Sequence, residues 1–105
     1  MRLIYRILGI AAVASTALVA ADAAAGKALY AQKCKACHAE DGKGNPAIAK
    51  ALKVTLRPLG SKEVQAKADG ELAKTITAGT GKMKAVNGVS AAQAGDIVAF
   101  VRTLK

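Results

Sequence analysis

The segment Cys34-Lys35-Ala36-Cys37-His38 contains the residues with the most specific chemistry in this sequence. A Cys-X-X-Cys-His run is typical of covalent haem attachment, in which each thiol adds to one vinyl group of the porphyrin. The two-residue gap places both sulfur atoms along one edge of the ring, and the adjacent histidine lies below the iron as its proximal ligand. We therefore expect one c-type haem, attached to Cys34 and Cys37 and coordinated by His38.

Two other chemistries use closely spaced cysteines, and the sequence favours neither of them. A redox disulfide of the thioredoxin type lies in a βαβ context, and the chain has no credible strand pattern. A structural zinc site needs four ligands, usually in two separated pairs, whereas this chain offers one Cys pair and one His. Haem attachment is the preferred interpretation of the motif.

Met83 is the one methionine besides Met1. It lies in a Gly-rich stretch, residues 79–88, between two expected helices, where core packing explains a methionine poorly. Its thioether suits the sixth position of a haem iron, where a soft sulfur favours the reduced state and raises the potential. We expect Met83 to be the second axial ligand. The alternative is a side chain that only covers the edge of the pocket.

The N-terminus has the features of a secretory leader. Arg2 and Arg6 precede an uncharged apolar run, Ile7 to Ala21, which is 15 residues long. A membrane-spanning helix needs about 20 such residues, so we expect cleavage rather than an uncleaved anchor. Two small-residue cleavage patterns follow, ending at Ala21 and at Ala23, and we favour the second. The prediction is a leader over residues 1–23, one domain over residues 24–105, and a periplasmic location.

The composition of the predicted domain suits a cofactor. Tyr30 and Phe100 are its only aromatic residues, and domains of this size often need a staple beyond their own core. A buried haem would cross-link the chain at two points and would fill its core. The formal charge of +9 becomes +8 without the charged leader residues Arg2, Arg6 and Asp22. Nucleic acid is not an expected partner, because platforms for base stacking are missing; at most, transient contact with a membrane surface is expected.

Helical periodicity and capping signals dominate residues 23–105, so we predict an all-α fold. Ser90 and Gln93 match a capping box, and apolar residues then recur at helical spacing up to Leu104. Asp69 is a plausible N-cap for the helix before the Gly-rich stretch. The expected helices cover residues 23–35, 47–53, 61–68, 69–78 and 90–104, with residues 54–60 irregular.

Taken together, these motifs resemble the small bacterial class I c-type cytochromes, which carry one haem. The chain shares with them Gly26 and Tyr30 before the haem motif, the segment Phe100-Val101-Arg102-Thr103-Leu104, and Gly79-Thr80-Gly81-Lys82-Met83. The resemblance covers nearly all of residues 24–105. It implies about four helices wrapped round one covalent haem, His/Met axial ligation, and a close crossing of the first and last helices with Gly26 against Phe100.

The resemblance also implies a role for Pro46. At other positions the chain differs from the family pattern. In this family a proline carbonyl in the loop after the motif usually accepts the proximal imidazole N–H, which fixes the ring; we assign that role to Pro46. Relatives often have Pro after the axial Met, an aromatic slightly later and a Ser helix cap, where this chain has Lys84, Val86 and Ala68. A looser ligand loop is therefore expected.

A haem with both axial positions filled has no open site for a substrate, so we expect a soluble electron carrier and not an enzyme. Four lysines flank the expected ligands: Lys33, Lys35, Lys82 and Lys84. They would steer the protein, acting as a monomer, to acidic faces of redox partners. Two alternatives stay open. One is a haem subunit of a larger oxidoreductase complex, and the other is a gas-binding or sensing haem protein with a labile Met83.

Overall fold

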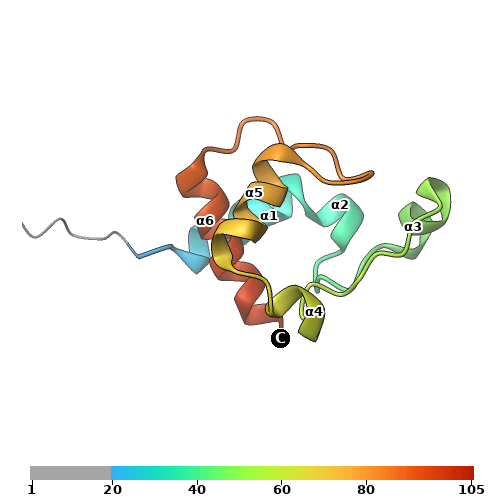
Figure 1. Ribbon diagram of the computed structural model, residues 1–105, viewed down its shortest axis with the longest axis horizontal. Coiled ribbons are helices and arrows are strands. Elements are labelled where there is room, and N and C mark those ends of the chain that lie inside the picture. The colour runs from blue at the N-terminus through green and yellow to red at the C-terminus, as the bar shows by residue number, and fades with distance from the viewer. Residues whose placement is uncertain (1–19) are drawn as a thin grey trace, which may run out of the picture.

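The computed structural model describes residues 20–105, so most of the leader predicted over residues 1–23 lies outside the described part. The described chain is helical, with a single isolated bridge between Thr80 and Met83, and this confirms the all-α class. None of the helices in this part is long and apolar enough to cross a membrane. The elements are α1 (Ala23–Lys33), α2 (Lys35–His38), α3 (Pro46–Leu52), α4 (Lys62–Gln65), α5 (Asp69–Ala78), α6 (Ala91–Val101) and a 3₁₀ turn η1 (Arg102–Leu104) (Figure 1).

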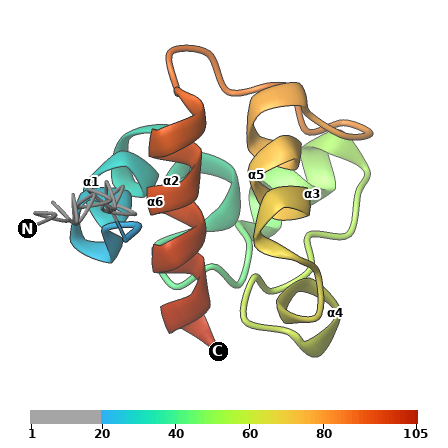
Figure 2. The same cartoon turned by 60° about the vertical axis from the view of Figure 1, so that its left-hand side comes forward.

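Helices α1 and α6 cross closely and make the most extensive helix–helix contact of the described chain (Figure 2). The crossing requires glycine at position 26, where a Cβ atom would lie 1.9 Å from the main-chain oxygen of Asp96 and 2.9 Å from the nitrogen of Ile97. The close approach expected at Gly26 is therefore present. The atoms nearest to it belong to Asp96, one turn before Phe100. Phe100 packs on Tyr30 instead, with ring centroids 5.0 Å apart.

Helix α6 provides most of the core. Its capping box is formed as predicted: Gln93 N–H donates to the Ser90 hydroxyl, and Ser90 N–H donates to the Gln93 side chain. The apolar stripe beyond it is buried, which is why this helix can anchor α1 on one side and α5 on the other. The buried core residues of the described chain are Tyr30, Cys34, Ile76, Ala94, Ile97, Val98, Phe100 and Val101.

Arg102 ties the end of α6 to the segment between α4 and α5. Its guanidinium donates to the carboxylate of Asp69 at 2.7 and 3.0 Å, and to the main-chain oxygens of Gln65 and Lys67 at 2.8 and 2.6 Å. The predicted N-cap role of Asp69 is wrong, because this carboxylate pairs with Arg102 and α5 begins at Asp69 itself. The N-cap position belongs to Ala68, which has no side chain to cap the helix.

Ala68→Ser is therefore expected to stabilise the fold. The backbone of Ala68 already has the extended geometry of an N-cap, with φ −65° and ψ 151°, so a serine hydroxyl can accept one of the free N–H groups of the first turn. The expected gain in the free energy of unfolding is about 1 kcal/mol, measured by denaturant titration. Ala78→Ser, at the other end of α5, is the control and should give no gain. An equal effect of both substitutions would contradict the capping argument.

Candidate functional site

The predicted attachment motif occupies one helical turn, α2, at the end of α1. Helix α1 ends at Lys33 rather than at Lys35 as expected, and Cys34 joins the two helices with φ −118° and ψ −31°. The N–H groups of Cys37 and His38 both donate to the main-chain oxygen of Cys34, at 3.3 and 3.0 Å. Cys34 therefore lies directly before α2, and Cys37 lies within it. The two cysteines are not joined by a disulfide; Cys34 is buried and Cys37 is exposed.

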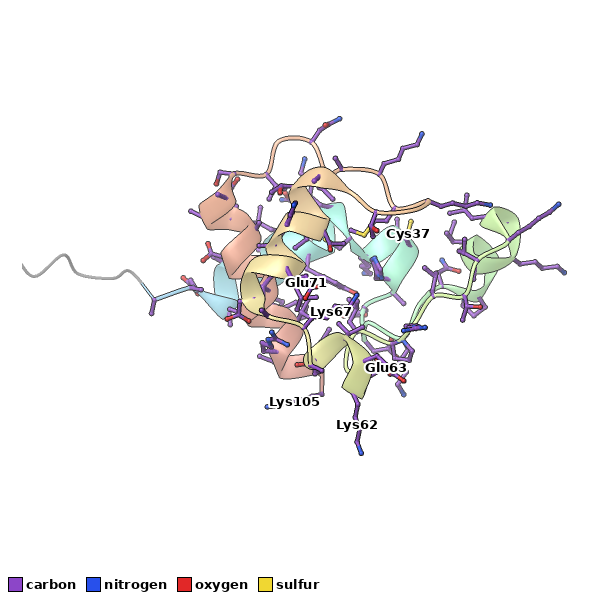
Figure 3. The ribbon with its side chains drawn as sticks, viewed as in Figure 1. Cys37, Lys62, Glu63, Lys67, Glu71 and Lys105 are labelled. Carbon is purple, nitrogen blue, oxygen red and sulfur yellow. The ribbon has the colours of Figure 1, made fainter. Side chains whose placement is uncertain are left out.

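The structure brings Cys34, His38 and Met83 to one apolar pocket. Met83 comes from a segment distant in sequence, so its presence there depends on the tertiary fold. Cys37 does not line this pocket; Figure 3 shows it on α2, across the molecule from Lys62 and Glu63 of α4. The other lining residues come from α1, α4, α5, α6 and the segment before α4, and are almost entirely apolar: Tyr30, Leu59, Val64, Leu72, Thr75, Ile76, Ile97, Val98 and Val101.

The imidazole of His38 has the properties of a metal ligand. Burial lowers its pKa, so the ring is neutral at physiological pH and keeps a nitrogen lone pair for coordination. Its Nδ1 atom is buried and has no hydrogen-bond partner within the described residues. The predicted bond to the Pro46 carbonyl is therefore not formed in this structure. Pro46 is the first residue of α3, and its positioning role stays a prediction.

Gly44 and Asn45, in the loop that follows α2, form hydrogen bonds with main-chain oxygens of α2. The N–H of Gly44 donates to the His38 oxygen at 2.9 Å, and the N–H of Asn45 donates to the Cys37 oxygen at 2.8 Å. The Asn45 side chain donates to the Ala36 oxygen at 3.2 Å and accepts from Ala47 N–H at the start of α3. This role of Asn45 was not predicted from the sequence. The available signal was Asn before Pro, which is a frequent helix start.

Tyr30 fixes the chain directly after His38. Its hydroxyl donates to the Ala39 oxygen at 2.5 Å, and burial raises the pKa of Tyr30 to about 12, so the hydroxyl keeps its proton. Ala39 has φ 64° and ψ 167°, a region that is occupied almost only by glycine. The exit from α2 is thus held in a strained conformation by a partly buried hydrogen bond.

Ala39→Gly is expected to stabilise the protein. Relief of the strain amounts to about 1–3 kcal/mol, and the greater chain entropy of unfolded glycine offsets roughly 0.5–1 kcal/mol of it. We expect a net increase of about 1 kcal/mol in the free energy of unfolding, measured by denaturant titration of the holoprotein. Ala36→Gly, inside α2, is the matched control and should destabilise. A loss of stability at both positions would rule out strain at Ala39.

The loop that carries Met83 is a defined turn. The N–H groups of Thr80 and Met83 each donate to the other's main-chain oxygen at 2.9 Å. Gly79, with φ 77°, opens the turn; a Cβ atom there would lie 2.6 Å from the Met83 oxygen. Val86, one of the family departures, packs against the core, and its N–H donates to the Ile76 oxygen at 2.9 Å. The loop is fixed to α5 on both sides of Met83.

These groups fit a covalently attached haem. The site offers two cysteines in one turn, an imidazole whose pKa is lowered by burial, a thioether and an apolar lining. Before attachment, burial and the neighbouring Cys37 raise the pKa of the Cys34 thiol. Within residues 20–105, no three His, Cys, Asp or Glu side chains come together as a metal-binding cluster, so the zinc alternative gains no support there.

Comparison with known proteins identifies a family and a similar structure. The model of the cytochrome c family matches residues 23–105. Among solved structures, the KustC0563 c-type cytochrome is similar, with a TM-score of 0.64 and 29% sequence identity over 76% of this chain and 96% of its own. None of the curated proteins matches in sequence. The family match covers the attachment motif, the Met83 loop and every helix described above.

Proposed function

Because the chain belongs to the cytochrome c family, we propose that it is a soluble periplasmic carrier of single electrons, with His38 and Met83 as the axial ligands of its haem. The family and the c-type neighbour establish the coarser part: a small class I cytochrome with one covalently bound c-type haem and its iron, working in electron transfer. The location, the ligand pair and the partners are our proposal.

The observation that carries this proposal is the convergence of Cys34, His38 and Met83 on one apolar pocket. The haem iron, when bound, supplies one-electron redox chemistry. Cys34 and Cys37 would attach the group, and the His38 imidazole and the Met83 thioether would bind its iron. The apolar lining excludes water. With both positions held by the protein, no site is left for a substrate, and this favours a carrier over an enzyme.

The lysines around the ligands support docking to acidic partners. Lys33, Lys35, Lys82 and Lys84 are all exposed, and Lys33 also links α1 to the ligand loop through its Nζ, which donates to the Asn87 oxygen at 3.3 Å. A lysine-rich surface beside the two ligand segments attracts anionic partners and speeds their association in a salt-dependent way.

A kinetic experiment tests carrier function and docking together. The ferrous holoprotein is mixed with anionic hexacyanoferrate(III) or with a cationic cobalt(III) complex at several ionic strengths. We expect fast oxidation by both, with a rate that falls with salt for the anion only. Lys84→Glu should slow the anionic reaction by about tenfold at low salt. Lys62→Glu on α4, far from Cys37 in Figure 3, should change it much less. Slow oxidation by both reagents would contradict the carrier proposal.

An exported chain can be cleaved after Ala21 or after Ala23, and the contacts of Asp22 favour the first position. Asp22 is the N-cap of α1: its carboxylate accepts from the N–H groups of Ala24 and Ala25, and its own N–H donates to the Asp96 carboxylate at 2.8 Å. Cleavage after Ala21 would keep these bonds and add an ammonium beside Asp96, whereas cleavage after Ala23 would remove them. We therefore propose Asp22 as the first mature residue. Intact mass of the exported holoprotein tests this; a chain that begins at Ala24 would contradict it.

A further inference from the structure

The chain between α2 and α4 forms an extended arm, residues 43–57, with α3 at its tip. The arm is closed at its base, where Leu59 N–H donates to the Gly42 oxygen at 2.9 Å. Its first residues, Gly44 and Asn45, are bonded to α2, which carries the proximal histidine. Figure 1 shows α3 far from the other helices, and Leu52, at its last position, is 42% exposed. Helix α3 therefore makes little contact with the other helices.

Lys82 forms a hydrogen bond with the end of α3. Its Nζ donates to the Leu52 oxygen at 2.6 Å, and both ribbon views show the loop of residues 79–88 reaching toward α3 (Figures 1 and 2). The oxygen of Leu52 is one of the last carbonyls of α3, which have no partner inside the helix. A cation also interacts favourably with the negative end of a helix. The contact is thus a charged hydrogen bond to a free acceptor.

The hydrogen bond of Lys82 also restrains the loop that contains Met83. Lys82 directly precedes Met83 and lies inside the turn closed by Thr80 and Met83. Lys84 follows Met83, so no proline ring stiffens the chain on that side. The arm, bonded to α2 at its start and to Lys82 at its tip, joins the segment of the proximal ligand to the segment of the distal one.

We propose that Lys82 is a positioning residue that keeps Met83 at the iron by fastening the ligand loop to the α3 arm. The inference rests on the proposed His38/Met83 ligation and adds what holds the weaker of the two ligands in place. A loop released from the arm moves more easily, and Met83 then leaves the iron more often. The ligand itself, and the resting spectrum that it produces, stay unchanged.

The test is the rate at which imidazole replaces Met83 in the ferric holoprotein. The form of imidazole that binds iron is uncharged, so changes in protein charge have little effect on its approach. At saturating imidazole the observed rate is limited by dissociation of Met83. We expect Lys82→Ala to raise this limiting rate about fivefold, the effect of losing one typical hydrogen bond. Lys82→Arg, which keeps a charged donor, should stay near the wild type.

Lys50→Ala is the matched control, because Lys50 lies on α3 and its loss changes the charge equally. It should leave the limiting rate unchanged. The inference is overturned if Lys82→Ala behaves like Lys50→Ala while the wild type shows the methionine-to-iron absorption band. If the wild type lacks that band and binds imidazole as fast as Met83→Ala, then His/Met ligation itself fails, and the role of Lys82 fails with it.

Discussion

Met83→Ala is expected to open the sixth coordination position while the haem stays attached. The thioether is the soft ligand that favours the reduced state, so its loss should lower the reduction potential. The methionine-to-iron band of the ferric protein should disappear, and the ferrous protein should bind carbon monoxide readily. Absorption spectra and a potentiometric titration measure all three effects. The variant would then have an open site, which the proposed ligation closes in the wild type, and would act as a gas-binding protein.

Met83→Leu separates ligation from packing. Leucine fills a similar volume, and such exchanges usually cost less than about 1.5 kcal/mol, but leucine has no sulfur. We expect its spectrum and carbon monoxide binding to match those of Met83→Ala, while its free energy of unfolding stays closer to the wild type. A leucine variant that keeps the ferric band and resists carbon monoxide would show that Met83 only covers the pocket edge.

Gly26→Ala is expected to have the largest effect on stability. The added methyl group would lie 1.9 Å from the Asp96 oxygen and 2.4 Å from its carbonyl carbon. These atoms belong to the backbone of α6 and cannot move aside separately, so the two helices must move apart. Overpacking of a core typically costs about 1–3 kcal/mol; here we expect about 3 kcal/mol or more. That is a large part of the roughly 5–15 kcal/mol that stabilises a whole domain.

Gly95→Ala is the control for this prediction. Gly95 lies on α6 next to Asp96, and a Cβ atom there has nothing within 4 Å. Alanine in the middle of a helix should stabilise by about 0.5–1 kcal/mol relative to glycine. Denaturant titration of both holoproteins should show changes of opposite sign. Similar values for the two variants would mean that the α1–α6 crossing is not as tight as the structure has it.

Local patterns predicted the helices well where one segment contains all the information. Helix α6 has its capping box and its apolar stripe within a short stretch, and both are formed as predicted. Helix α5 has its predicted bounds but not its predicted cap. The carboxylate of Asp69 binds Arg102, which is 33 residues away. A local sequence pattern contains no information about such a distant competitor for the same oxygen atoms.

The residues of the candidate site also divide into those that the local sequence indicates and those whose roles depend on distant contacts. The attachment motif is contiguous, and Met83 stood out because the predicted domain has no other methionine, so both could be named as candidates from the sequence. The supporting contacts of Tyr30, Asn45 and Lys82 were not found. Each donates a side-chain hydrogen bond to a main-chain oxygen, and every residue has such an oxygen. Only the folded chain shows which of them lies within reach.

The ferrous spectrum of the native holoprotein, recorded with and without carbon monoxide, tests the central claim most directly. The chain is expressed with its N-terminal segment in a host that matures c-type haem. If His38 and Met83 hold both axial positions, the protein contains covalent haem and its spectrum does not shift when carbon monoxide is added. A prompt shift would contradict a closed carrier and favour the gas-binding alternative.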